Sequence, residues 1–350
     1  METHTNQTRP KASCITQGVF LNAFSTMKVG GRARFFAEVN SREDLEEVVS
    51  FVEMNELPMW ILGGGSNTVF SDKGFDGMVT KINLKGIQIE SEDTQYVYVR
   101  AGAGEGWDAF VEYAVNNNFG GIENLTSIPG TVGGGVVQNI GAYGVEIKHS
   151  VIEVTVYDSD TKQTLTLQTS ALRFGYRDSV FKQSEGKHLI VMSVLFRFTK
   201  QHDLHTSYKD LLEYFKEKTN ITILDIRKAL QEIRGKKFPN LEVCGTAGSF
   251  FKNCVIEEKK AHELKERYVD MPLFDMTTGY KKVGAAWLLD KVCGLRGFRE
   301  GDVGLFEHQS LVVVNFGNAT ADEIKTFVEK IKKIFFEKVG IELEEEVIVL

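Results

Sequence analysis

The sequence predicts an α+β fold in more than one domain, on three observations. The chain has 350 residues, which is too long for one ordinary compact core. Strand-like and helix-like segments are mixed without a regular βαβ repeat, which argues against a doubly wound parallel sheet. The composition changes near residue 200, where the polar segment 200–205 is followed by sequence that is poorer in glycine and richer in helical periodicity. We therefore place the main domain boundary near 200.

The first 200 residues predict mostly short strands. Ser41 followed by Asp44 is a typical helix start, and apolar residues at 45, 48, 49 and 52 continue it with helical spacing. A second helix is expected at about 107–116. Apolar or alternating runs predict strands at 58–62, 96–100, 151–157, 164–167 and 189–198.

After residue 200 the sequence predicts mainly helices. The expected helices lie at 224–234, about 257–268, and 283–292. Thr320 and Glu323 then start a long amphipathic helix, which Gly340 ends. The last segment, 341–350, is predicted to be a terminal strand.

Composition excludes several classes of protein. The 41 basic and 48 acidic residues give a net charge of −7, which does not favour a nucleic-acid binder. The uncharged stretch 124–145 contains six glycines and Pro129, so it is a poor membrane helix. The first 13 residues show no apolar signal segment, and the four cysteines form no CxxC motif. We expect a cytoplasmic protein with reduced cysteines and no metal site.

Glycine is in excess over proline, with 33 glycines and only 5 prolines. The predicted strand 58–62 runs directly into Gly63-Gly64-Gly65-Ser66-Asn67. Consecutive small residues expose several backbone N–H groups at one point, which is the chemistry of an anion site. Neither GxxxxGK[ST] nor a GxGxxG that opens a helix is present, so the two common nucleotide-binding motifs are excluded.

A second glycine-rich segment covers 128–144 and is free of charge. Two separate glycine loops with uncharged polar side chains suit a long, flat ligand that has a pyrophosphate and a ring system. The sequence therefore favours a flavin dinucleotide, while coincidental glycine turns remain the alternative.

Four motifs in order carry a family resemblance: Gly63 to Asn67, Asn139 to Glu146, Arg173 to Ser179, and Gly248 to Asn253. Together they resemble the UDP-N-acetylenolpyruvoylglucosamine reductases, the MurB flavoenzymes, over roughly residues 20–350. The segment Ser207 to Leu211 is similar to that of the type I members, which carry a tyrosine loop.

The resemblance implies a two-lobed FAD-binding domain of the vanillyl-alcohol-oxidase (PCMH) type. After a polar tail at 1–16, this domain would cover 17–200, with lobes at about 17–82 and 83–200. A substrate-binding domain at 201–350 would follow, and its last strand, 341–350, would reach the active site.

The implied reaction belongs to peptidoglycan synthesis. NADPH reduces non-covalent FAD, and the enolpyruvyl sugar nucleotide then enters the same cleft. Reduced flavin N5 gives hydride to C3 and a proton is added at C2, which yields UDP-N-acetylmuramate. The implied partners are therefore UDP-N-acetylglucosamine enolpyruvate and NADPH, and the implied assembly is a monomer.

The resemblance also assigns residues to ligands. FAD would be bound by Gly63, Gly64, Gly65, Ser66, Asn67, Thr68, Pro129, Gly130, Gly133, Gly134, Asn139, Ile140, Gly141, Ala142, Tyr143 and Gly144. The UDP-sugar would be bound by Tyr176, Tyr208, Lys237, Asn253 and Arg296.

Three residues match the family's catalytic positions. Ser249 matches the proton donor to C2, and its small neighbours leave room for a ligand beside the hydroxyl. Arg177 and Glu346 match the pair that stabilises the enolate-like intermediate. Because Glu345 replaces the family's proline, a shift of the catalytic role to Glu344 is the alternative.

Two rival functions remain open at this stage. One is a flavin-dependent oxidase with the same FAD fold, which would lack the matching catalytic set. The other is a non-catalytic protein that binds flavin or a nucleotide-sugar. Stable reduced flavin in air would favour the reductase over the oxidase.

Overall fold

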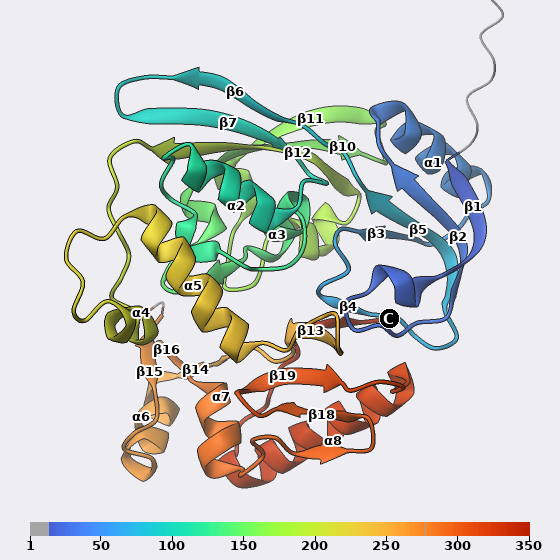
Figure 1. Cartoon of the computed structure of the whole chain (residues 1–350). Coiled ribbons are helices and arrows are strands. Elements are labelled where there is room, and N and C mark those ends of the chain that lie inside the picture. Colours follow the sequence, from blue (N-terminus) through green and yellow to red (C-terminus); the bar gives the residue numbers. More distant parts are fainter. Residues whose placement is uncertain (1–13, 277) are drawn as a thin grey trace, which may run out of the picture.

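The computed structural model describes residues 14–276 and 278–350, so most of the predicted polar tail lies outside the described residues. Two sheets are built from the first 200 residues, and a third, at the bottom of Figure 1, is built from strands between Gly245 and Asn315. No helix in the described ranges is long and apolar enough to cross a membrane.

The first sheet has the strand order β1-β2-β5-β3. β1 is antiparallel to β2, whereas β2 and β3 run parallel to β5. The Ser41 hydroxyl accepts the Asp44 N–H at the start of α1, which confirms the predicted cap. The bounds are β1 Ile15–Phe20, β2 Arg32–Val39, α1 Arg42–Met54, β3 Met59–Leu62, β4 Thr68–Val69 and β5 Phe75–Ile82.

The second sheet is antiparallel throughout, with the order β11-β10-β12-β7-β6. The helices α2 and α3 lie against one face of it (Figure 1), and Trp107 and Phe110 of α2 are buried there. The bounds are β6 Ile87–Glu92, β7 Tyr96–Gly102, α2 Trp107–Asn116, α3 Val132–Gln138, β8 Gly141–Ala142, β9 Val145–Glu146, β10 Val151–Asp158, β11 Gln163–Gln168 and β12 Leu189–Thr199. The strands and the helix expected here are confirmed.

The helix α3 lies inside the glycine-rich segment, where the sequence analysis expected only loops. Three of its seven residues are glycines, which have low helix propensity. The Thr131 hydroxyl accepts the Gly134 N–H at its start, and Asn139 ends it in a left-handed conformation. A Cβ on Gly133 would stand 2.8 Å from the Cβ of Ala103. Close packing and caps therefore form a helix that propensity does not predict.

Two helices after residue 200 pack on the second lobe. Arg227 of α5 is buried and donates to the Asp108 carboxylate of α2 at 2.8 and 3.1 Å. Leu211 of α4 and Ile226 of α5 join Tyr143 in one apolar cluster. The bounds are α4 Lys209–Tyr214 and α5 Ile223–Lys237.

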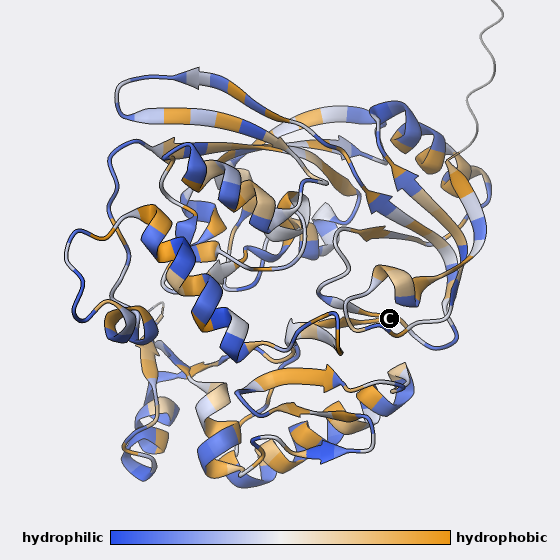
Figure 2. Cartoon of the chain, in the orientation of Figure 1, coloured by the Kyte–Doolittle hydropathy of each residue, from blue (hydrophilic) through white to orange (hydrophobic). Residues whose placement is uncertain are grey.

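The third sheet has the order β13-β19-β18-β17, with α8 packed against it. Figure 2 colours β19 mostly hydrophobic and α6 largely hydrophilic, in keeping with the burial of β19 between β13 and β18. The bounds are β13 Gly245–Ser249, β17 Arg299–Glu300, β18 Val303–Phe306, β19 Gln309–Asn315 and α8 Ala321–Val339. A smaller sheet, β14-β16-β15, comprises Cys254–Glu257, Tyr280–Val283 and Leu273–Asp275, and α6 spans Glu258–Arg267.

One expectation for the last third of the chain is confirmed with a later start, and another is wrong. Val283 closes strand β16, so the expected helix begins only at α7 (Ala285–Trp287), which continues as a π-turn at Leu288–Val292. The expected strand 341–350 shrinks to β20 (Ile348–Val349), which pairs in parallel with β4 of the first lobe. The chain end crosses from the third sheet back to β4 (Figure 1), and such a crossing cannot continue one strand ladder.

Short 3-10 helices complete the structure at Leu21–Phe24, Glu123–Leu125, Ile147–His149, Thr169–Leu172, Val180–Lys182 and Ser184–Gly186.

Candidate active site

A cavity of about 1240 Å³ is lined by residues from β3, α3 and β12, from α5 and β13, and from the end of the chain. This volume exceeds the ordinary range for a single small ligand, so the cavity has room for a large cofactor and part of a second ligand. The segments that line it include 59–68, 127–142, 231–241, 246–249 and the residues Glu346 and Ile348.

The loop between β3 and β4 forms an anion site on one wall. Gly65 has φ +63°, a left-handed conformation that glycine adopts without strain. Within residues 14–276 and 278–350, the backbone N–H groups of Gly65, Ser66 and Asn67 have no hydrogen-bond acceptor. Successive unpaired N–H groups of this kind bind phosphate oxygens.

The second glycine-rich segment packs directly against this loop. A Cβ on Gly64 would stand 2.7 Å from Gly130 Cα, and one on Gly63 would stand 2.8 Å from the Thr131 hydroxyl. The Ser66 hydroxyl donates to the Pro129 carbonyl at 3.1 Å. The glycines therefore let the two loops meet as one cradle, and neither loop carries a charged side chain.

Most of the residues predicted to bind FAD line the cavity: Gly63 to Thr68, Pro129, Gly130, Gly133, Gly134, Ile140, Gly141 and Ala142. Three do not. Asn139 caps α3 and donates to the Glu146 carboxylate and the Gly175 carbonyl. Tyr143 packs in the cluster under α4 and α5, where burial raises the pKa of its phenol to about 12. Gly144 turns the chain at φ +84°.

The three predicted catalytic residues lie on the same cavity. Arg177 Nε stands 2.8 Å from Glu346 Oε1, and Arg177 Nη2 donates to the Gly141 carbonyl at 2.8 Å. The Glu346 N–H donates to the Phe250 carbonyl at 2.8 Å, which brings Glu346 beside Ser249 on β13. Glu344 points elsewhere, because its carboxylate is 70% exposed and pairs with Lys252 at 3.1 Å.

Comparison with known proteins agrees with this arrangement. Residues 33–166 match the family model for an FAD binding domain, and residues 239–350 match that for the C-terminal domain of UDP-N-acetylenolpyruvoylglucosamine reductase. A UDP-N-acetylenolpyruvoylglucosamine reductase of Chromobacterium violaceum is 39% identical over 95% of this chain and 98% of its own length. That of Flavobacterium johnsoniae is 38% identical over 94% and 98%.

The chain belongs to the UDP-N-acetylenolpyruvoylglucosamine reductase family. The crystal structure of such a reductase (MurB) from Thermus caldophilus has the same fold, with a TM-score of 0.67 at 24% identity over 95% of this chain and 98% of that one. The predicted family, the α+β fold and the FAD cofactor are therefore confirmed.

The charge of the cavity in this reductase-family chain is strongly positive. Its lining contains Arg177, Lys182, Lys187 and Arg234 against the single carboxylate of Glu346, which gives +3 inside a protein of net charge −7. Glu346 is thus the only carboxylate among the described residues that line the cavity. An excess of cations in an enclosed site favours anionic ligands.

The five residues predicted to bind the UDP-sugar lie outside the cavity lining, in separate places. The Tyr176 hydroxyl accepts the Asn253 N–H at 3.2 Å, beside Arg177. Tyr208 packs edge-on to Tyr143 with ring centroids 5.2 Å apart.

The two cationic residues of this group, Lys237 and Arg296, already pair with carboxylates. Lys237 forms an ion pair with Asp210 of α4. Arg296 pairs with Asp290 at 3.5 Å and is half exposed. The structure thus brings Tyr176 together with Asn253, and it pairs Lys237 with Asp210, two residues after Tyr208. It does not bring all five around one ligand position.

Sequence reasoning missed three cavity residues that the structure brings out: Gln138, Lys182 and Arg234. Arg234 donates to the Ser127 carbonyl at 3.3 Å and packs on the Phe238 ring, and burial lowers the pKa of its guanidinium. Among the described residues, no carboxylate lies within 4 Å of it. For Lys182, the available signal in the sequence was its position three residues after the matched motif at 173–179.

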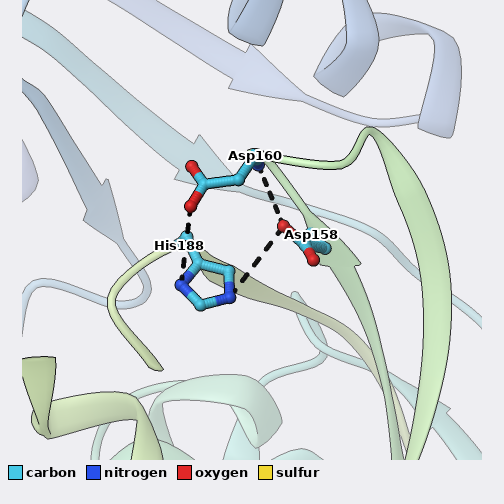
Figure 3. Close-up of side chains that lie close together, drawn as sticks. All are labelled: Asp158, Asp160 and His188. Atoms are coloured by element: carbon cyan, nitrogen blue, oxygen red, sulfur yellow. Dashed lines mark hydrogen bonds and ion pairs between the residues drawn. The ribbon is translucent and has the colours of Figure 1, made fainter. Parts of the chain in front are cut away.

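A separate polar cluster lies where β10 ends and β12 begins (Figure 3). The two ring nitrogens of His188 stand 3.9 Å from the carboxylates of Asp158 and Asp160. The Asp158 carboxylate also accepts the backbone N–H groups of Asp160 and Thr161. These bonds close the turn into β11, and none of the three clustered side chains lines the cavity.

Proposed function

We propose that this chain is an NADPH-dependent flavoenzyme that reduces UDP-N-acetylglucosamine enolpyruvate to UDP-N-acetylmuramate in peptidoglycan synthesis. The observation that carries the proposal is a single cavity that contains both glycine-rich loops together with Ser249, Arg177 and Glu346. Relatives at 38–39% identity over nearly their whole length bear the name of this reductase.

Bound FAD supplies the hydride chemistry, because it accepts a hydride from NADPH and passes one to C3 of the enolpyruvyl group. The chain's own residues hold and orient the reactants. The N–H groups of residues 65–67 would hold the pyrophosphate of FAD, and the close packing of Gly64 on Gly130 leaves no side chain between the two loops.

Arg177 and Glu346 act on the substrate's carboxyl group. Hydride addition at C3 moves negative charge onto C2 and its carboxylate, and a guanidinium stabilises that charge in a site with little water. The Gly141 carbonyl fixes Arg177 Nη2. Glu346 lies 2.8 Å from Arg177 Nε, so the carboxylate and the guanidinium reach the same part of the cavity.

Ser249 delivers the proton to C2, so that one hydride and one proton reduce the double bond. Gly248 precedes it with φ +75°, and a Cβ there would meet no atom within 4 Å, which leaves open space for the substrate beside the hydroxyl. A serine hydroxyl is a weak acid, so its neighbours must supply or relay the proton.

The cavity's charge of +3 favours this substrate, since a nucleotide diphosphate and a carboxylate are both anions. We assign the UDP part to Tyr176, Tyr208, Lys237, Asn253 and Arg296. Tyr176 and Lys237 are next in sequence to residues that line the cavity, Arg177 and Phe238 respectively.

The test is spectroscopic and anaerobic. Purified protein loaded with FAD should lose its flavin absorbance on addition of NADPH and regain it when the enolpyruvyl sugar nucleotide is added. In Ser249→Ala the first change should persist and the second should slow by about a hundredfold. Failure of the wild-type protein to regain its colour would overturn the proposed function.

A further inference from the structure

The ammonium group of Lys182 contacts the backbone of Arg177 directly and is connected to Glu346 through Gln138. Lys182 Nζ donates to Gln138 Oε1 at 3.0 Å and to the backbone carbonyl of Arg177 at 2.9 Å. It lines the cavity, and within the described residues no carboxylate lies within 4 Å of it. Its two hydrogen bonds therefore go to neutral acceptors, one in Arg177 itself and one in Gln138, which contacts Glu346.

The first of these bonds fixes the orientation of the Gln138 amide. An ammonium can only donate, so Gln138 must present its carbonyl oxygen to Lys182. The amide nitrogen then points the other way and donates to Glu346 Oε1 at 3.2 Å. With the amide reversed, Nε2 would face the ammonium and Oε1 would face the carboxylate, and both contacts would be repulsive.

The second bond holds the backbone of Arg177. Arg177 has φ +55°, a left-handed conformation that costs a side-chain-bearing residue free energy and persists only where neighbours hold it. The ammonium of Lys182 binds the carbonyl of this same residue. Lys182 therefore stabilises the backbone from which the catalytic guanidinium projects.

The ion pair between Arg177 and Glu346 does not by itself fix the relative orientation of the two side chains. Arg177 Nε is buried and lies 2.8 Å from Glu346 Oε1, yet its N–H is not directed along a hydrogen bond to that oxygen. The two side chains are instead held from outside, by the Gly141 carbonyl on one side and by Gln138 on the other. Their relative position depends on these outer contacts.

We propose that Lys182 and Gln138 are positioning residues that hold Arg177 and Glu346 in register for reduction of the enolpyruvyl substrate. This inference rests on the proposed function, because that function gives the pair its substrate. Lys182 and Gln138 act only through Arg177 and Glu346, so transfer of hydride from NADPH to FAD does not require them. Burial lowers the pKa of Lys182, with Lys252 as the next largest cause, which agrees with an ammonium that is largely removed from water.

The experiment separates the two half-reactions by anaerobic stopped-flow absorbance of the FAD-loaded enzyme. In Lys182→Met, bleaching by NADPH should stay within about twofold of wild type. Recolouring at saturating enolpyruvyl sugar nucleotide should slow by about tenfold to a hundredfold, the cost of a misplacement near 1 Å. Gln138→Leu should act in the same direction, and Lys182→Arg, which can still donate to both acceptors, should recover part of the rate.

Lys252→Met is the matched control. Lys252 is the cation with the largest influence on the pKa of Lys182, but its side chain pairs with Glu344 and lies outside the cavity lining. It should leave both half-reactions unchanged, which separates positioning from a simple loss of positive charge.

Each result decides one question. If wild-type enzyme is bleached by NADPH but never recolours with the substrate, the proposed function fails whatever the variants do. If wild type completes the cycle and both Lys182→Met and Gln138→Leu recolour at its rate, the positioning role is wrong. It is also wrong if both half-reactions slow equally in both variants, because that is the result of a general loss of structure. Should Lys182→Met fail to fold, the Gln138→Leu result decides alone.

Discussion

Replacing Gly65 by alanine tests whether the loop after β3 is the pyrophosphate site. The substitution adds a Cβ that would stand 1.8 Å from the Phe24 carbonyl oxygen. Because ordinary Cβ contacts begin near 3.0 Å, the loop or its neighbour must move by more than about 1 Å. The φ of +63° adds about 1 kcal/mol of backbone strain for alanine.

This movement should weaken FAD binding. The N–H groups of residues 65–67 have no acceptor among the described residues and are left for the pyrophosphate. A shift of this size should remove at least one charge-assisted hydrogen bond, worth about 1.5–3 kcal/mol. We expect the dissociation constant of FAD to rise by about tenfold to a hundredfold or more. Titration of the apoprotein with FAD, followed by flavin fluorescence, measures it.

Gly301→Ala is the control for the strain alone. Gly301 has a similar φ of +55°, but a Cβ there would meet no atom within 4 Å. This variant should lose about 1 kcal/mol of unfolding free energy and bind FAD like wild type. Wild-type FAD affinity in Gly65→Ala would refute the placement of the pyrophosphate at this loop.

Three further predictions follow from single residues. Glu346→Gln should slow turnover by at least about a hundredfold, whereas Glu344→Gln should stay near wild type; the reverse ranking of their steady-state rates would move the catalytic role to Glu344. Arg234→Gln should weaken binding of FAD or of the sugar nucleotide by about tenfold, measured as a dissociation constant, because it removes a guanidinium that has no carboxylate within 4 Å in the described part of the chain. Asp225, whose pKa is lowered to about 2 chiefly by its hydrogen bond from Lys218, should stabilise the fold above pH 4 and lose that contribution as the pH falls towards 2. The difference in unfolding free energy between wild type and Asp225→Asn should therefore shrink across that range, and a constant difference would contradict the assignment.

The fold was predictable wherever a segment forms its structure from local pattern. The helix at 42–54 follows from the Ser41 cap and from buried Leu45, Val48 and Val49. The helix at 321–339 follows in the same way from Thr320 and Gly340. The helix at 132–138 was not predictable, because its stability comes from packing on Ala103 and not from propensity.

The site was predictable only in part, for a related reason. The loop at 63–68 is contiguous in sequence, so its anion-binding chemistry is visible there. Gln138 is 44 residues from Lys182 and 208 residues from Glu346. Nothing in these spacings shows that the Gln138 amide connects the Lys182 ammonium to the Glu346 carboxylate. Hydrogen bonds over such separations depend on the folded arrangement alone.

The pairing of β20 with β4 explains why the terminal segment is irregular and why it is nevertheless part of the site. Asn67, the last residue of the FAD loop, donates its amide to the Glu346 carbonyl at 3.1 Å, and its own carbonyl accepts the Ile348 N–H at 3.0 Å. On the other side, the Glu346 N–H is held by the Phe250 carbonyl, next to Ser249. Glu346 is thus fixed between the glycine loop that precedes β4 and the strand that carries Ser249. A regular strand at 341–350 would extend a single sheet, and Glu346 could then not bond to Asn67 and to Phe250 at the same time. The distortion of this segment is therefore what places a carboxylate from the end of the chain between the predicted flavin and the predicted acid.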